Sequence, residues 1–237
     1  MIIKLNGGLG NTLFQWAYGR SYELATGEEV FFDKSSLASG HPPRRYGLGD
    51  YNIEVKFAPD DMPGERLCDY WQSEKYFNAE VIRKELVQPK GTPNPKCICM
   101  AKKILHSPDC GFIGIRRADY LWPERIAYHG VLPIEYYQRA NLEFPVKLNR
   151  EWFIFTDDKE WAKQIPYEVV DVNGPEEKHW DIWLMSLCKH AIISNSTFHW
   201  WGAWLGADKR GGKVICPKNW FANGMKTEIV PQRWITL

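Results

Sequence analysis

The sequence predicts an α/β fold whose C-terminal half is a doubly wound, mostly parallel sheet. Short apolar runs there alternate with longer amphipathic segments, and a strand, a glycine turn, a helix and a second strand follow one another at the N-terminus. Both patterns are typical of βαβ units. In the C-terminal half we expect strands at 111–115, 152–156, 167–172, 191–194 and 213–216, and helices at 133–143, 158–164, 180–189 and 197–205.

The N-terminal half is shorter and richer in turn residues. Its expected elements are a strand at 2–5, a helix at about 12–26, a strand at 29–33 and a short helix at 78–86, with an irregular stretch at 35–68. Three prolines and a glycine in residues 88–95 favour a linker. We therefore expect two domains, residues 1–95 and 96–237.

Composition limits the classes of partner and compartment. The chain has 237 residues and a formal net charge of +1, which argues against a nucleic-acid partner or a general affinity for anionic lipid. No stretch approaches the roughly 20 apolar residues of a membrane span, and the N-terminal apolar run is too short for a signal peptide. We expect a cytoplasmic protein with no integral membrane segment, able to associate peripherally with the inner membrane face.

Cysteine and tryptophan content carries less information about function. The six cysteines form no CxxC pair, so we interpret them as reduced thiols that mostly fill the core. The chain contains twelve tryptophans, most of them in its last third. We interpret them as core residues in preference to platforms on which a sugar stacks.

Two adjacent arginines directly follow the expected strand at 111–115. A guanidinium stays charged and presents a rigid fork of donors that fits a phosphate bidentately. In an open α/β sheet, ligands bind beyond the carboxyl ends of the strands. Arg116 and Arg117 therefore predict a phosphate site. The alternative is a solvated arginine pair, with Asp119 as an ordinary ion-pair partner.

Polar residues also follow the expected strand at 191–194. Asn195, Ser196 and Thr197 stand where the next helix begins, and Ser196 or Thr197 suits its N-cap. Backbone amides and hydroxyls at such a junction can hold phosphate oxygens. Since parallel strands end at one edge of a sheet, we expect this loop to converge with the arginine pair. A plain helix cap is the alternative.

A glycine-rich turn joins the first expected strand to the first helix. Gly8, Gly10 and Asn11 lie where the backbone can approach a ligand and a helix N-terminus can face it. The turn is neither a GxGxxG nor a Walker loop, and a tight turn without a ligand is equally compatible with the spacing. Asp157 and Asp158 follow another strand, and we interpret them as a helix cap, with no metal site predicted.

Seven segments in this order carry a family resemblance. They are 7–11 with Phe14 and Gln15, 70–77, 116–120, 155–158 with Trp161, 181–186, 194–205 and 217–221. With these segments the chain resembles the α-1,2-fucosyltransferases, an inverting glycosyltransferase family. The resemblance implies a GT-B-like architecture of two Rossmann-like halves, with residues 96–237 binding the donor and residues 1–95 facing the acceptor. It further implies GDP-β-L-fucose as donor substrate, no cofactor, no metal requirement and a glycan acceptor, of which a lipid-linked glycan is one form.

Three positions depart from the family pattern. Gly114 stands where the family's arginine motif usually has a histidine, Ala118 replaces its usual glycine, and Thr12 replaces a glutamine that often follows the first loop. Loss of the histidine removes a contact to the donor that the resemblance would imply. The chain is also shorter than typical members.

The expected reaction is attack of an acceptor hydroxyl, such as the 2-OH of galactose, on the anomeric carbon of fucose to form an α-1,2 linkage. Negative charge then grows on the β-phosphate of GDP, and we assign its stabilisation to Arg117 first and Arg116 second, with Ser196 and Thr197 in support. Asp119 is the first choice of general base; His199, Glu74 and Asp157 are alternatives. The competing functions are transfer from another GDP-sugar and a non-catalytic sugar-nucleotide or glycan-binding module.

Overall fold

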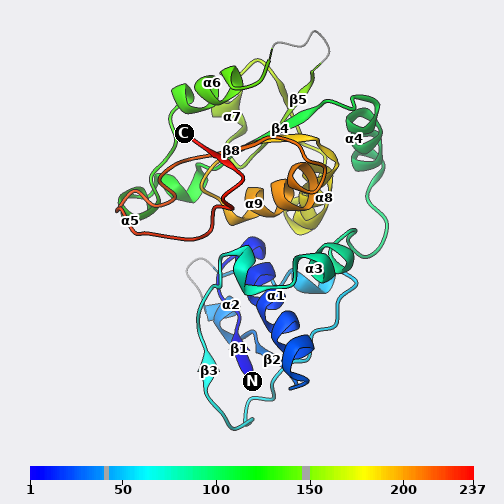
Figure 1. Cartoon of the computed structure of the whole chain (residues 1–237), viewed down its shortest axis with the longest axis vertical. Coiled ribbons are helices and arrows are strands. Elements are labelled where there is room, and N and C mark those ends of the chain that lie inside the picture. Colours follow the sequence, from blue (N-terminus) through cyan, green and yellow to red (C-terminus); the bar gives the residue numbers. More distant parts are fainter. Residues whose placement is uncertain (40–42, 146–149) are drawn as a thin grey trace. The chain divides into compact units, whose positions relative to one another are not determined.

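A six-stranded sheet organises the second half of the computed structural model, and all of its strand pairs are parallel (Figure 1). The strands are β4 (Gly111–Ile115), β5 (Trp152–Thr156), β6 (Glu168–Val169), β7 (His190–Ile193), β8 (Val214–Cys216) and β9 (Ile235–Thr236). They lie in the order β6-β5-β4-β7-β8-β9. Counted along the chain this is the 3-2-1-4-5-6 order of a Rossmann-like sheet, which confirms the predicted fold class.

The structure describes residues 1–39, 43–145 and 150–237. These divide into two compact units, Met1–Gly91 and Thr92–Leu237. The second unit begins just before α4 (Pro95–His106), so the expected domain boundary at residues 95 and 96 falls in the first turn of that helix.

Helices cover both faces of the six-stranded sheet. The two sets are α6 (Ile134–Leu142) with α7 (Lys159–Ala162), and α8 (Lys178–Leu187) with α9 (Thr197–Ala203) (Figure 1). Side chains alternate between faces along a strand. Ile113 and Ile115 of β4 accordingly pack in a core cluster with Tyr136 of α6, while Gly114 between them faces His199 of α9.

Tryptophan side chains form the core around α9. Trp200, Trp201 and Trp204 are completely buried, and the rings of Trp200 and Trp204 stack with centroids 5.7 Å apart. Trp200 also donates a 2.7 Å hydrogen bond from Nε1 to the carbonyl oxygen of Ile229, so its one polar atom is satisfied. The interpretation of these three residues as core is confirmed.

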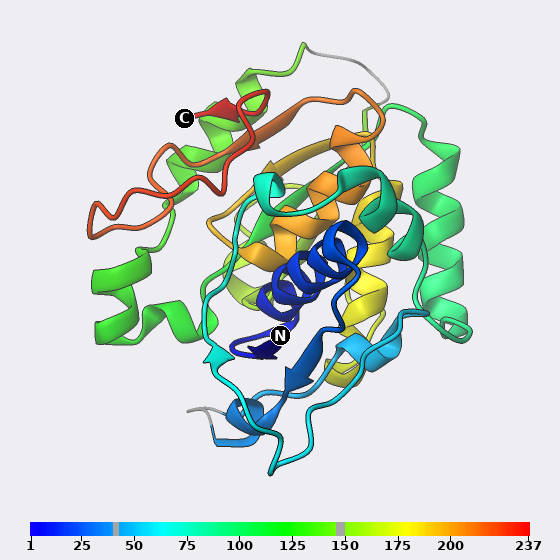
Figure 2. The ribbon, with the colours of Figure 1, turned by 60° about the horizontal axis from the view of Figure 1, so that its bottom comes forward.

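The first unit contains a three-stranded parallel sheet in the order β2-β1-β3. Its elements are β1 (Ile2–Lys4), α1 (Leu9–Thr26), β2 (Phe31–Asp33), α2 (Ser35–Ser39), β3 (Arg66–Leu67) and α3 (Ala79–Glu85). The helix α1 connects β1 to β2 in the chain. Figures 1 and 2 show it lying along this sheet. The predicted N-terminal βαβ unit is confirmed.

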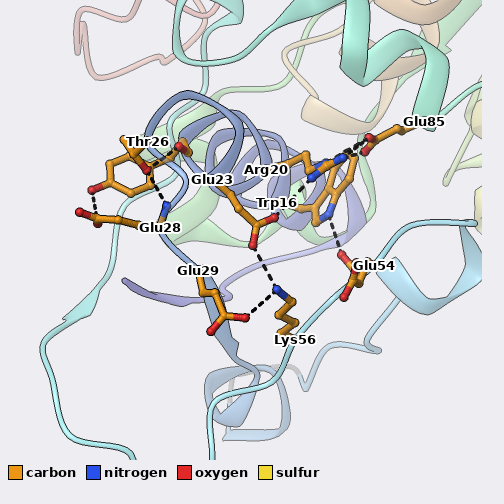
Figure 3. A network of polar contacts seen from close by, with 10 residues as sticks. Trp16, Arg20, Glu23, Thr26, Glu28, Glu29, Glu54, Lys56 and Glu85 are labelled. Carbon is orange, nitrogen blue, oxygen red and sulfur yellow. Dashed lines mark hydrogen bonds and ion pairs between the residues drawn. The ribbon is translucent and has the colours of Figure 1, made fainter.

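An ion-pair network joins α1 to its neighbours in the first unit (Figure 3). Arg20 of α1 donates to both carboxylate oxygens of Glu85 at the end of α3, from Nε at 3.1 Å and from a terminal nitrogen at 2.8 Å. Lys56 contacts Glu23 of α1 at 3.4 Å and Glu29 before β2 at 3.0 Å. Bidentate arginine geometry favours order in such a partly exposed network, which therefore fixes α3 and the segment around Lys56 against α1.

Two helices were missed from the sequence because proline begins each of them. Pro95 opens α4 behind Asn94, whose side chain caps the helix, so the residues that favoured a linker partly belong to a helix start. Pro123 likewise opens α5 (Pro123–His129). The stretch 35–68, expected to be irregular, contains α2 and β3, and residues 40–42 of it lie outside the described residues.

No helix within residues 1–39, 43–145 and 150–237 combines the length and apolar character needed to cross a bilayer. All six cysteines are free thiols, and Cys97, Cys110, Cys188 and Cys216 are buried.

Replacing Trp200 by alanine is expected to lower the free energy of unfolding of the second unit by about 3–5 kcal/mol, because a fully buried ring leaves a cavity. The measurement is urea denaturation followed by far-UV circular dichroism. Leu142→Ala is the control, since Leu142 is 81% exposed and should change stability by no more than about 0.5 kcal/mol. Equal stability of the two variants would contradict the role of the tryptophan core.

Candidate functional site

The strand order of the large sheet reverses between β4 and β7. Gly114 pairs with Ile193 across these two strands, and the amide of Ser194 donates to the carbonyl oxygen of Gly114 at 2.9 Å. In doubly wound sheets the crevice at such a reversal, beyond the carboxyl ends of the strands, is the usual ligand site. The arginine pair follows β4 and the polar loop follows β7, so the fold brings both predicted segments to this edge.

The loop after β7 is held by hydrogen bonds to three other segments. Tyr120 donates to the carbonyl oxygen of Asn195 at 3.2 Å, and the Asn195 amide donates to the carbonyl oxygens of His129 and Trp220 at 2.7 and 3.1 Å. Asn195 is only 2% exposed, and its Oδ1 is buried without a partner among the residues that the structure describes. The structure thus places the predicted Asn195 inside the loop, where its amide fixes the backbone.

Arg116 is engaged at both ends of its guanidinium. One terminal nitrogen pairs with Asp157 at 2.7 Å and the other with Asp119. The guanidinium also lies over the ring of Tyr120, 5.1 Å from its centroid. Arg116 therefore contributes positive charge from a fixed position, with little capacity for a bidentate contact of its own.

Arg117 is held in a different way. Its backbone amide donates to Asp157 at 2.8 Å, and its Nε donates to Asp158 at 3.1 Å. The guanidinium stacks on Trp161 at 4.3 Å from the ring centroid. Its two terminal nitrogens have no hydrogen-bond partner in the part of the chain that the structure describes. Arg117 is thus oriented by its inner nitrogen and its planar face, and its outer fork can bind an anion bidentately.

Asp119 lies between two guanidinium groups. It pairs with Arg116 and, at 3.4 Å, with Arg125, and its side chain is 12% exposed. These contacts are the Asp–Arg pair that the sequence offered as the alternative to a catalytic role.

Asp158 caps α7, as the sequence predicted for this aspartate pair. Its carboxylate accepts a 3.0 Å hydrogen bond from the amide of Trp161 while also holding Arg117. Within the described residues, no three His, Cys, Asp or Glu side chains gather into a group that could hold a metal ion.

Ser196 occupies the N-cap position of α9, but its side chain makes no capping hydrogen bond within the described part of the chain. Its amide instead donates to the carbonyl oxygen of Ser194 at 2.8 Å, and its carbonyl accepts from Trp200 at 2.9 Å. Ser196 is buried and Thr197 is half-buried at the first residue of α9. Both predicted residues therefore lie at the same sheet edge as the arginines.

Two histidines border this loop, of which His199 is buried and His129 is half-buried. Burial and the nearby Arg116 lower the pKa of His199 to about 3, and burial and the nearby Arg125 lower the pKa of His129 to about 4. Both imidazoles are therefore neutral at pH 7. The sequence singled out only His199; His129, which stacks on Tyr120 with ring centroids 4.3 Å apart, had no sequence signal.

The remaining predicted residues lie in the first unit, at the start of α1. Gly8 is its N-cap residue and Gly10 belongs to its first turn, while Asn11 accepts a 3.0 Å hydrogen bond from Gln72. Gly7 before them has φ +79°, and a Cβ there would lie 2.3 Å from Nδ2 of Asn11, so the turn requires glycine at this position.

Comparison with known proteins gives a consistent set of similarities. A family model described as glycosyl transferase family 11 matches residues 70–237. The chain is 38% identical over 145 residues to the O-antigen biosynthesis glycosyltransferase WbnK of Escherichia coli, an alignment that covers 57% of this chain and 47%, about half, of that relative. It is 26% identical to an α-1,2-colitosyltransferase of Escherichia coli, with 100% of this chain and 98% of the relative covered.

A solved structure is also similar. The crystal structure of the α-1,6-fucosyltransferase NodZ soaked with GDP-fucose superimposes with a TM-score of 0.50 at 15% identity, covering 86% of this chain and 92% of that chain. At this identity the likeness concerns the fold, and it agrees with the α/β architecture described above.

Substitutions of Asp158 separate the contribution of its helix cap to stability from that of its ion pair with Arg117. Asp158→Ala is expected to lower the free energy of unfolding by about 1 kcal/mol, because α7 loses its N-cap, whereas Asp158→Asn should stay within about 0.5 kcal/mol, because asparagine caps as well as aspartate. Urea denaturation at pH 7 measures both. If Asn is as destabilising as Ala, the ion pair with Arg117, and not the cap, is the stabilising contact.

Proposed function

Since the chain belongs to glycosyl transferase family 11, we propose that it is an inverting glycosyltransferase that moves L-fucose from GDP-β-L-fucose to a glycan hydroxyl. The observation that carries this proposal is the outer fork of Arg117, which no described residue pairs, at the point where the strand order reverses. Residues 96–237 would bind the donor and residues 1–95 would face the acceptor.

The charges around Arg117 suit a diphosphate. Arg116, Arg117 and Arg125 are balanced by three aspartates in the described site, and each arginine is oriented by at least one of them. A guanidinium that is already stacked and hydrogen-bonded through Nε loses less conformational freedom when it binds a phosphate. Ser196 and Thr197 of the loop after β7 lie at the same edge, and we assign their hydroxyls a supporting role toward the phosphates.

In the proposed reaction the acceptor hydroxyl attacks the anomeric carbon as the bond from that carbon to the β-phosphate oxygen breaks. The configuration inverts from β to α, GDP leaves with the bonding electron pair, and the hydroxyl proton passes to a base. Negative charge grows on the β-phosphate, where Arg117 stabilises it with Arg116 in support. A departing diphosphate is a good leaving group, so the demand on a general acid is small.

The acceptor is proposed to be the 2-OH of a galactose, in a free or lipid-linked glycan at the inner membrane face. The α-1,2 linkage in the name of the colitosyltransferase relative supports this linkage, whereas the NodZ structure belongs to an α-1,6 enzyme. A second candidate function is transfer from another GDP-sugar, and the colitosyl group in that same relative's name favours it.

Replacing Arg117 by alanine is expected to lower the rate of acceptor-dependent GDP release from GDP-fucose by about 10²–10³-fold, because a charge-stabilising donor is lost from the leaving diphosphate. The assay uses a panel of galactose-terminated acceptors. Arg139→Ala is the matched control, since Arg139 is an exposed arginine of α6 and should leave the rate unchanged.

Other outcomes of this assay discriminate the alternatives. GDP release from a different GDP-sugar but not from GDP-fucose would establish the second candidate donor. GDP binding without release from any donor would indicate a binding module. No GDP binding at all would contradict a nucleotide-sugar function.

The proposed base role of Asp119 has its own test. Asp119→Asn should lower kcat by about 10²–10⁴-fold with little change in GDP affinity if the carboxylate accepts the proton. Loss of GDP affinity at nearly unchanged kcat would instead show that Asp119 only holds Arg116 and Arg125. Steady-state kinetics and calorimetric GDP titration measure the two quantities.

A further inference from the structure

The imidazole of His199 fills the space beside Gly114. A Cβ on Gly114 would lie 2.4 Å from Cγ of His199 and 2.8 Å from its Cδ2 and Nδ1. Real Cβ atoms do not approach ring atoms this closely, so any side chain at position 114 and the His199 ring would compete for one volume. Glycine in the middle of the fully buried β4 is therefore the condition for this placement of the histidine.

The position of the ring is fixed from α9. His199 is 4% exposed, and its Nδ1 lies 2.9 Å from Oγ of Ser194 at the end of β7. Ser194 is fully buried, and its hydroxyl has no other side-chain partner in the described residues. Nδ1 is thus the one side-chain acceptor that the described residues offer to this hydroxyl, and when Ser194 donates to it the neutral ring carries its own proton on Nε2.

That second nitrogen is available. Nε2 of His199 has no hydrogen-bond partner in residues 1–39, 43–145 and 150–237, and it is not among the polar atoms that are sealed from solvent without one. Besides burial, the positive charge of Arg116, which follows β4, lowers the pKa of the ring. The ring is therefore neutral at pH 7, oriented through Nδ1 and within electrostatic range of Arg116.

We infer that His199 is a donor-binding residue of this site, with Nε2–H donating a hydrogen bond to the diphosphate of the GDP-sugar. The inference rests on the proposed function and adds to it a group that comes from α9. Gly114 leaves a volume beside β4, and an imidazole supplied by the neighbouring crossover fills it.

A set of four variants tests this inference by calorimetric titration with GDP. His199→Ala should weaken GDP binding by about tenfold, the loss of one hydrogen bond to a charged acceptor. Gly114→His alone should lower the urea midpoint, because its side chain meets the His199 ring. Gly114→His combined with His199→Ala should restore GDP affinity at least several-fold relative to His199→Ala, because the imidazole returns from β4.

The matched control is Gly114→Ala combined with His199→Ala, which refills part of the space without an imidazole. It should recover stability but not GDP affinity. Equal GDP affinity of the two double variants, or native affinity in His199→Ala, would overturn the inference while leaving the proposed function intact. If the native chain itself fails to bind GDP, both fail. Far-UV circular dichroism of each variant establishes that it is folded before titration.

Discussion

The parallel pairing of β4 with β7 is the constraint on which the site depends. These strands are distant in sequence, yet Gly114 lies opposite Ile193 and the chain leaves both strands at one edge. The strand order reverses there, so the crossovers that follow the two strands diverge to opposite sides and leave their first loops side by side. Without this pairing the arginines after β4 and the polar loop after β7 would have no reason to meet.

Burial of charge explains the form of the arginine pair. Guanidinium groups beside a packed sheet need compensation, and the site provides it from Asp119 in the same loop and from Asp157 and Asp158 after β5. The compensation is unequal. The aspartates of the described site pair with both terminal nitrogens of Arg116 but only with Nε of Arg117. Arg116 therefore adds positive charge to the site, and Arg117 keeps its terminal nitrogens for contact with an anion.

Periodicity and turn chemistry sufficed for most of the large sheet. The strands at 111–115 and 152–156 have the predicted bounds, because each is a short apolar run between polar residues. Helices that begin at proline were not predictable in the same way, since Asn94-Pro95 suits a linker as well as an N-cap followed by N1. Within the site, residue type indicated the arginines and the Asp158 cap. It could not indicate which arginine nitrogens stay unpaired or that His129 stacks on Tyr120, because both depend on packing between segments far apart in sequence.

Gly114 and His199 show that a sequence motif and a binding site are defined differently. A motif specifies a position in the chain, whereas a ligand meets a volume and the groups in it. Here the volume beside β4 can be reached from the strand itself or from α9, which begins at Thr197, soon after β7 ends at Ile193. Glycine at position 114 leaves this volume to the histidine, whereas any side chain there would meet the ring. Departure from a sequence pattern and retention of its chemistry are compatible wherever two crossovers border one space.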